Sequence, residues 1–298
     1  MESQVEASVK ARLRSQESLD SCVKSHRRKL VIENRRGLFD IGWSDLWEYR
    51  EVLYILVWRD IKVRYKQTAI GISWVLLQPL IMMLIFTAVF GMWAKMPSDG
   101  VWYPVFALTA LLPWTYFSQA IVRAGESVVV HGRMVTKIYF PRLLLPLAMS
   151  ISPLVDFALS LVLLFGLLIY AGIPLTWKVI MLPVFILLAM LTAVGLSLFT
   201  SAMNVRYRDV GHALPFLIQI WMYASPIVYP VSLVPEQWRG LYGLNPMVGV
   251  IEAFRWALLG QTAPDPTVIV QSVLVLFTGL TAGLVFFRKM ERDFADFL

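Results

Sequence analysis

Residues 235–260 read PEQWRGLYGLNPMVGVIEAFRWALLG, and the interpretation of the whole chain depends on this stretch. It lies between two long apolar runs, each long enough to cross a bilayer. The stretch is too apolar and too aromatic for a solvated loop, yet it is interrupted too often for a spanning helix. The interrupting residues are Pro235, Gly240, Gly243, Pro246 and Gly249.

Asn245 and Pro246 predict a turn in this stretch, because a proline biases its predecessor away from the α region. Apolar residues then recur at helical spacing, and Glu252 and Arg255 lie three apart on another side of that helix. We therefore predict two short helices that re-enter the membrane from one face and gate a path, since irregular backbone at that depth needs protein or water around it. The alternative is an amphipathic hairpin that lies flat on the membrane surface.

Composition places the chain among membrane proteins. Of its 298 residues 58% are hydrophobic and 16% are charged, whereas soluble domains carry about 25% charged residues. The net charge of +7 does not indicate nucleic-acid binding, because the basic residues fall beside the apolar runs, where membrane orientation and lipid headgroups account for them. The one cysteine, Cys22, excludes an intramolecular disulfide and a cysteine-based metal site.

The first 66 residues have two different patterns. Residues 1–42 are polar and charged without an apolar run, which predicts a disordered cytoplasmic tail. Residues 43–66 are amphipathic, with a stripe that includes Trp47, Tyr54 and Trp58. This pattern predicts a helix in the cytoplasmic interface, and the alternative is a soluble helix packed on a partner protein.

Six apolar segments follow, each near the length of about 20 residues that a crossing helix needs. The fold class is therefore predicted to be an all-α membrane protein, with a transmembrane domain over residues 67–298 and the hairpin between its fifth and sixth spans. The predicted spans are about 72–93, 103–122, 145–170, 179–202, 213–231 and 267–287.

The Lys/Arg bias predicts the orientation. One side has few basic residues, namely Lys95, Lys178, Arg239 and Arg255. The other side includes both termini and most of the basic residues, which are Arg59, Lys62, Arg64, Lys66, Arg123, Arg133, Lys137, Arg142, Arg206, Arg208, Arg288, Lys289 and Arg292. Both termini are therefore expected in the cytoplasm and the hairpin outside.

The loop between the second and third spans, residues 123–142, is short and half apolar. Val128, Val135, Ile138 and Phe140 predict a helix face that docks into a groove on a partner, and Pro141 ends it. The alternative is an ordinary juxtamembrane turn.

Asp156 is the one ionisable residue deep in a predicted span, and such residues face the bundle interior or water. It could serve a proton relay, but the absence of a second acid or base within the spans favours a structural carboxyl group. Aromatic residues at the outer ends are either belt anchors or the lining of an exit path. The candidates for the path are Trp102, Tyr223, Tyr229, Trp238 and Trp256.

Motifs of catalysis are missing from the chain. It has no GxxxxGK[ST], HExxH or GxSxG sequence, and its three histidines are far apart, so we predict no catalytic residue, cofactor or metal site. Energy for transport would then come from another chain or an ion gradient.

Four segments in register resemble the permease subunits of type-2 ABC exporters, in the branch that exports O-antigen, capsule and teichoic acid. They are WRDIKVRYKQTAIGISWVLLQP (58–79), FPRLLLP (140–146), NVRYRDVG (204–211) and LNPMVGVIEAFRWALLG (244–260). The resemblance covers about residues 43–298.

The resemblance implies a non-enzymatic homodimer in the inner membrane with two copies of a separate ABC ATPase, which binds ATP and Mg. It implies a coupling helix within residues 125–140, with Arg133 and Lys137 beside the apolar face as further contacts to the ATPase. It also implies that Asn245, Pro246, Glu252 and Arg255 occupy the positions of the external gate.

The function expected from this resemblance is ATP-driven export of lipid-linked polysaccharide. The alternatives are a membrane-embedded transferase acting on lipid-linked sugars and a type-2 ABC exporter of a small molecule. A transferase would need converging acid and base residues, which Asp156 alone does not supply. A small-molecule exporter would favour polar residues within the spans over an aromatic hairpin.

Overall fold

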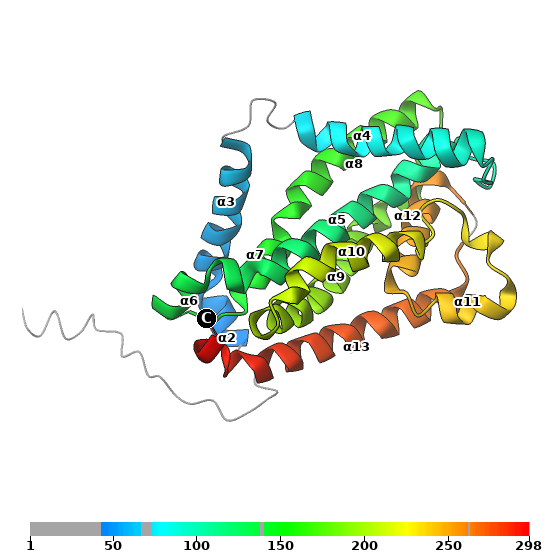
Figure 1. Cartoon of the computed structure of the whole chain (residues 1–298). Helices are drawn as coiled ribbons and strands as arrows, with labels where there is room; N and C mark the ends of the chain where they lie inside the picture. The colour runs from blue at the N-terminus through cyan, green and yellow to red at the C-terminus, as the bar shows by residue number, and fades with distance from the viewer. Residues whose placement is uncertain (1–42, 67–72, 138–139, 262, 298) are drawn as a thin grey trace, which may run out of the picture. The chain divides into compact units, whose positions relative to one another are not determined.

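The computed structural model describes residues 43–66, 73–137, 140–261 and 263–297, so the predicted tail over 1–42 lies outside the described residues. Every regular element of this described part is a helix (Figure 1), which confirms the all-α class. Five of its helical segments are long and apolar enough to cross a membrane, and the predicted fifth span is not among them. The five segments are Ser73–Trp93, Tyr103–Val130, Leu144–Tyr170, Trp177–Arg206 and Pro266–Glu291.

Helix α5, Tyr103–Val130, is the most buried of these segments and, besides η1 (Thr87–Trp93) and the adjoining α6, contacts six α-helices of the described part. Its 28 residues span about 42 Å, which exceeds the roughly 30 Å of a bilayer's hydrocarbon core. The helix therefore extends beyond the apolar layer, and α6 (Gly132–Lys137) follows directly after His131. The six neighbours are α4 (Ser73–Phe86), α7 (Leu144–Ile151), α8 (Pro153–Tyr170), α9 (Leu182–Arg206), α10 (Asp209–Tyr223) and α12 (Pro246–Leu259).

Helices α2 (Trp43–Glu48) and α3 (Arg50–Lys66) form the predicted N-terminal helical segment. Leu56 of α3 is buried in a core with residues of α7 and α9. Trp47, Tyr54 and Trp58 are instead exposed, and the Tyr54 and Trp58 rings stack at 6.5 Å. The predicted single apolar stripe is thus divided between a side that packs on the bundle and a side that protein does not cover.

Helix α10 ends at Tyr223, before the predicted end of the fifth span at residue 231. Residues 224–230 form turns and bends, because Pro226 and Pro230 cannot donate the backbone hydrogen bonds of a continuing helix. The predicted hairpin follows as α11 (Glu236–Tyr242) and α12. The remaining elements are η1 (Thr87–Trp93), η2 (Trp177–Met181), η3 (Val231–Leu233), α13 (Pro266–Glu291) and α14 (Phe294–Phe297).

Two glycines allow α9 and α13 to cross closely. A Cβ on Gly195 would lie 2.8 Å from the Cα of Leu280, and one on Gly283 would overlap the carbonyl oxygen of Gly195. Small residues at such crossings increase the van der Waals contact on which helix association in a bilayer depends.

We expect Gly283→Ala to lower the thermal stability of the purified protein, because the added methyl group forces α9 and α13 apart. Overpacking of this kind costs about 1–3 kcal/mol. Gly279→Ala, one turn earlier on α13, is the matched control because a Cβ there meets nothing within 4 Å. Equal melting temperatures for the two variants would contradict the close crossing.

Candidate functional site

A cluster of charged side chains joins the end of α3 to the start of α8. Both oxygens of Asp156 are engaged, since Oδ2 accepts from Arg64 and Oδ1 accepts from the Tyr65 hydroxyl. Arg64 Nη2 also donates to Asp60 Oδ2 at 2.6 Å and to Ser152 Oγ at 2.7 Å. Asp156 is therefore a paired carboxylate, and this geometry favours the structural interpretation over a proton relay.

The sequence reading missed the partners of Asp156. Arg64 and Asp156 are 92 residues apart, and Arg64 lies on the helix that precedes the first span rather than within a span. The pKa of Tyr65 is raised to about 12, mainly by burial and to a smaller extent by the hydrogen bond to Asp156. Its hydroxyl therefore stays protonated and donates at neutral pH. A polar Arg-Tyr pair in the last turn of α3 is the signal that could have indicated this contact.

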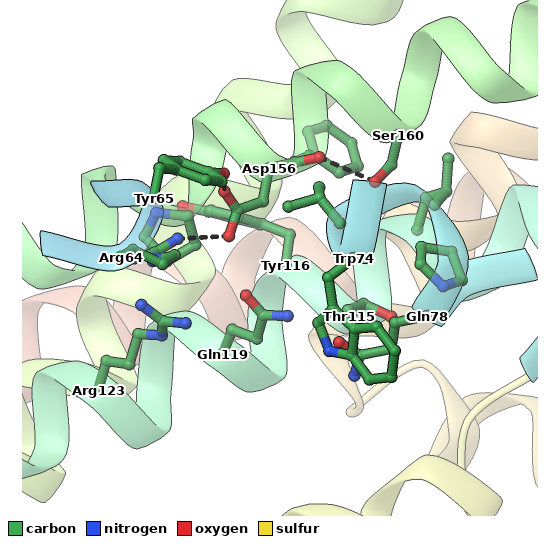
Figure 2. A pocket seen from close by; sticks show the side chains of 15 residues that line it. Arg64, Tyr65, Trp74, Gln78, Thr115, Tyr116, Gln119, Arg123, Asp156 and Ser160 are labelled. Atoms are coloured by element: carbon green, nitrogen blue, oxygen red, sulfur yellow. Dashed lines mark hydrogen bonds and ion pairs between the residues drawn. The ribbon is translucent and has the colours of Figure 1, made fainter. Parts of the chain in front are cut away.

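A cavity of about 570 Å³ lies beside this cluster, between the end of α3 and helices α4, α5 and α8 (Figure 2). Thr115, Gln119 and Arg123 of α5 line it at a spacing of four residues, which places them on one face of the helix. Figure 2 shows Gln119 and Arg123 on the side of α5 that faces Arg64. A polar stripe therefore runs along the most buried helix of the bundle.

The turn between α11 and α12 is fixed by Asn245. Its Oδ1 accepts from the backbone N–H of Met247 at 3.1 Å, so it caps α12, and Pro246 occupies the first helical position. Its Nδ2 donates to Ser225 Oγ at 2.9 Å. Asn245 thus joins the start of α12 to the segment that follows α10.

Arg255 of α12 has only 1% of its surface exposed and is a further link to that segment. Its guanidinium donates to the carbonyl oxygens of Ile227 at 3.2 Å and Tyr229 at 3.5 Å. It also lies 3.7 Å from the ring centroid of Phe106, a cation–π distance. Arg255 therefore satisfies carbonyl groups of the non-helical segment that follows α10.

Glu252 pairs with Arg255, with 3.3 Å between Oε1 and Nη1. Burial raises the pKa of Glu252, and the neighbouring guanidinium opposes that rise. Both members of the pair thus lie on α12, whereas the backbone partners of Arg255, Ile227 and Tyr229, lie outside that helix. Of the four gate positions that the resemblance implies, Glu252 and Arg255 pair with each other, Asn245 and Pro246 begin α12, and Asn245 and Arg255 both bind the segment after α10.

The five predicted path aromatics do not gather in one place. Trp102, Tyr223 and Trp238 are exposed, as belt anchors would be. Tyr229 accepts from the Tyr242 hydroxyl at 3.1 Å. Trp256 lines a separate apolar cavity of about 380 Å³ among α9, α12 and α13.

The predicted coupling loop packs mainly against its own chain. Val128, Val135 and Phe140 are buried in the core that contains Leu56 of α3, and Ile138 lies outside the described residues. Arg133 and Lys137 of α6 are exposed. The side chains of α6 described as exposed are therefore basic, Glu126 and Val130 of α5 are also exposed, and three of the four residues of the predicted apolar face are buried in the chain's own core.

Comparison with known proteins identifies the family. The model of the ABC-2 type transporter family matches residues 51–259. The chain belongs to the ABC-2 type transporter family. Within this transporter the matched range includes the charged cluster, the cavity and the hairpin.

Relatives of this ABC-2 transporter cover most of its length. The O-antigen export system permease protein RfbA of Myxococcus xanthus is 30% identical over 254 residues, which are 85% of this chain and 97% of RfbA. RfbA of Klebsiella pneumoniae is 26% identical over 253 residues, 83% of this chain and 95% of that protein. The polysialic acid transport protein KpsM of Escherichia coli is 24% identical over 246 residues, which are 78% of this chain and 91% of KpsM.

We expect Arg255→Met to destabilise the transporter by about 3–5 kcal/mol, because it leaves Glu252 and two carbonyl groups without their donor. Thermal unfolding of the purified protein measures the loss. Arg239→Met is the matched control, since Arg239 belongs to a Glu–Arg pair of the same spacing in α11 whose Glu236 is 90% exposed, and such pairs contribute less than about 1 kcal/mol.

Exchanging the charges, as Glu252→Arg with Arg255→Glu, tests whether stability depends on the ion pair or on the backbone partners of Arg255. A glutamate at position 255 cannot donate to the carbonyls of Ile227 and Tyr229, so the exchange should not restore stability. Full recovery would show that the pair itself, and not the backbone contacts, holds the hairpin.

Proposed function

We propose that this chain is the permease subunit of an ATP-driven exporter that moves lipid-linked polysaccharide across the inner membrane. The observation that carries the proposal is the similarity to O-antigen export permeases over nearly the whole length of those proteins. KpsM, named for polysialic acid transport, extends the similarity to a relative named for another polysaccharide. The ATP and Mg would bind to a separate ABC ATPase, two copies of which would serve a homodimer of this chain.

The proposed membrane arrangement has six crossings with both termini in the cytoplasm. Five crossings correspond to the long apolar helices, and the sixth would consist of α10 together with residues 224–231. The distribution of Lys and Arg supports this orientation. Helices α2 and α3 would lie in the cytoplasmic interface, where the exposed Trp47 of α2 and Trp58 of α3, each with a basic side chain over its ring at 5.3 Å, suit lipid headgroups.

In this arrangement the hairpin of α11 and α12 would re-enter the membrane from outside and act as the gate. The buried contacts of Asn245 and Arg255 support a closed state in which the broken backbone after α10 is covered by protein, as a bilayer requires. The engagement of both Asp156 oxygens argues against the transferase alternative, because a general base needs an accessible oxygen.

Deleting the gene should trap lipid-linked polymer in the cytoplasm and remove it from the cell surface. Surface labelling with and without permeabilisation measures both pools, and the wild-type gene supplied in trans is the control. A transferase would instead yield polymer that reaches the surface in altered form, and normal surface polymer would contradict the proposal.

Helix α6 should contact the ATPase through its basic side chains. We expect Arg133→Glu with Lys137→Glu to reduce stimulated ATP hydrolysis at least about tenfold while leaving the melting temperature near wild type, because both side chains are exposed. Val135→Asp should instead lower stability, since Val135 is buried.

Lys95→Glu, an exposed charge reversal on the proposed external side, is the control for the coupling experiment. Normal hydrolysis in the α6 double variant would show that this helix is not the contact that transmits ATP hydrolysis to the membrane bundle.

A further inference from the structure

The apolar cavity of about 380 Å³ among α9, α12 and α13 is separate from the buried contacts of the hairpin, because Asn245 and Arg255 do not line it. Helices α9 and α13 belong to segments that are long and apolar enough to cross a membrane. Among the described lining residues, the polar side-chain groups are the Trp256 indole N–H and the Ser272 hydroxyl, which already donates to the Gly243 carbonyl oxygen at 3.3 Å. The cavity therefore offers an occupant apolar contact rather than a set of hydrogen bonds.

Small side chains create this cavity. A Cβ on Gly249 of α12 would lie 2.6 Å from the Cβ of Ser272, so α12 and α13 cross closely at this point. One turn further along α12, Ala253 lines the cavity with only a methyl group. The Phe185 and Trp256 rings line it as well, with their centroids 6.2 Å apart. Protein interiors are close-packed, and a space of this size forfeits van der Waals contact unless something fills it.

The mouth of the cavity lies on the outer surface of these helices. Ala263, Pro266 and Val270 line the cavity and are exposed. The exposed apolar surface continues along α13 with Leu274 and along α9 with Leu187. The medium that adjoins the surface of a membrane-spanning helix is the hydrocarbon of the bilayer, so lipid chains have direct access to this mouth.

The volume of the cavity favours a flexible chain over a helix of a partner protein. An α-helix with its side chains is about 10–12 Å in diameter and rises about 5.4 Å per turn, so a single turn occupies roughly 400–600 Å³. The cavity is smaller than that. An apolar cavity of about 150 Å³ is large enough to bind benzene, so the space among α9, α12 and α13 accommodates a longer hydrocarbon.

Charged groups of both signs lie beside the lining. Lys178 Nζ lies 4.9 Å from the centroid of the Trp256 ring, which borders the cavity. Asp265 stands between Pro264 and Pro266, which both line the cavity, and its exposed carboxylate caps α13. A zwitterionic phospholipid has a phosphate group for the cation and an ammonium group for the carboxylate, whereas an anionic lipid would have a partner for the cation alone.

We propose that this cavity holds an acyl chain of a zwitterionic phospholipid, with the phosphate group near Lys178 and the ammonium group near Asp265. The chain would complete the packing of α12 against α9 and α13 as a bound component of the bundle. This lipid is a constituent of the membrane and not the exported polymer, so the inference does not depend on the proposed cargo.

The test uses the purified full chain, with any copurifying ATPase, in detergent after removal of bound lipid. Phosphatidylethanolamine, phosphatidylglycerol with the same acyl chains, and glycerophosphoethanolamine, which is the head group without chains, are added separately. Native mass spectrometry measures binding, and the shift in melting temperature measures stabilisation. We expect phosphatidylethanolamine to bind and stabilise, phosphatidylglycerol to bind at least about threefold more weakly for want of one exposed ion pair, and the head group alone to do neither.

Filling the cavity should displace the lipid. We expect Ala253→Phe to weaken phosphatidylethanolamine binding at least about tenfold, because a ring at position 253 occupies the space of the chain. Val270→Trp at the exposed mouth is a second variant with the same expected effect, in case Ala253→Phe fails to fold. Leu274→Trp is the matched control, because Leu274 is exposed one turn further along the same helix and does not line the cavity.

Lys178→Gln and Asp265→Asn test the contacts of the head group. Each should weaken phosphatidylethanolamine binding at least about threefold, and Asp265→Asn keeps a side-chain oxygen that can cap α13. Lys95→Gln, which removes an exposed positive charge away from the cavity lining, is the control.

Wild-type affinity in Ala253→Phe and Val270→Trp would overturn the site. Equal binding of phosphatidylglycerol would overturn the zwitterionic head group, and equal binding of glycerophosphoethanolamine would overturn the role of the chain. A wild-type protein that binds none of the three probes would overturn the proposal as a whole.

Discussion

The hydrogen bonds from Arg255 to the carbonyl oxygens of Ile227 and Tyr229 are the contacts on which the segment between α10 and α11 depends. A helix that breaks within an apolar layer leaves carbonyl groups that water cannot reach, and each unsatisfied group costs free energy. The segment after α10 breaks at Pro226, and it is held by Arg255, by Asn245 and by the Tyr103 hydroxyl, which donates to the Val228 carbonyl oxygen at 2.9 Å. Residues of α12 and its N-cap therefore supply hydrogen-bond donors to the segment where the helix of α10 has ended.

Helix α5 connects the Arg255 contacts to the cavity beside Asp156. Phe106 near its beginning lies under the Arg255 guanidinium, and Arg123 near its end lines the cavity. Arg123 follows Phe106 by 17 positions, which correspond to about 25 Å along the axis. Because α5 is a single helix with nearly continuous burial, a displacement at one end has a rigid element through which to act on the other. The same helix continues toward α6, where contact with an ATPase is proposed.

The region around Asp156 and the end of α5 depends on contacts that α3 makes with the bundle. Arg64 and Tyr65 bind Asp156, and Arg59 Nη2 lies 2.6 Å from His131 Nε2 at the junction of α5 and α6. An N-terminal helix that precedes every span is thus tied both to the cavity and to the proposed coupling helix. This arrangement explains why Val128, Val135 and Phe140 are buried with Leu56 and leave the basic side chains of α6 exposed.

The sequence by itself determined the helical class, most of the spans and the place of the hairpin, because apolar periodicity and proline positions report local backbone preferences and membrane insertion. It also placed Glu252 and Arg255 within reach of each other, since a spacing of three is a helical contact. Only the tertiary structure decided that Arg255 is buried against the segment after α10, that Arg64 reaches Asp156 across 92 residues, and that Val128, Val135 and Phe140 of the predicted coupling loop lie in the chain's own core. These contacts join segments far apart in the chain, and their pairing follows from how the helices pack, which no local pattern encodes.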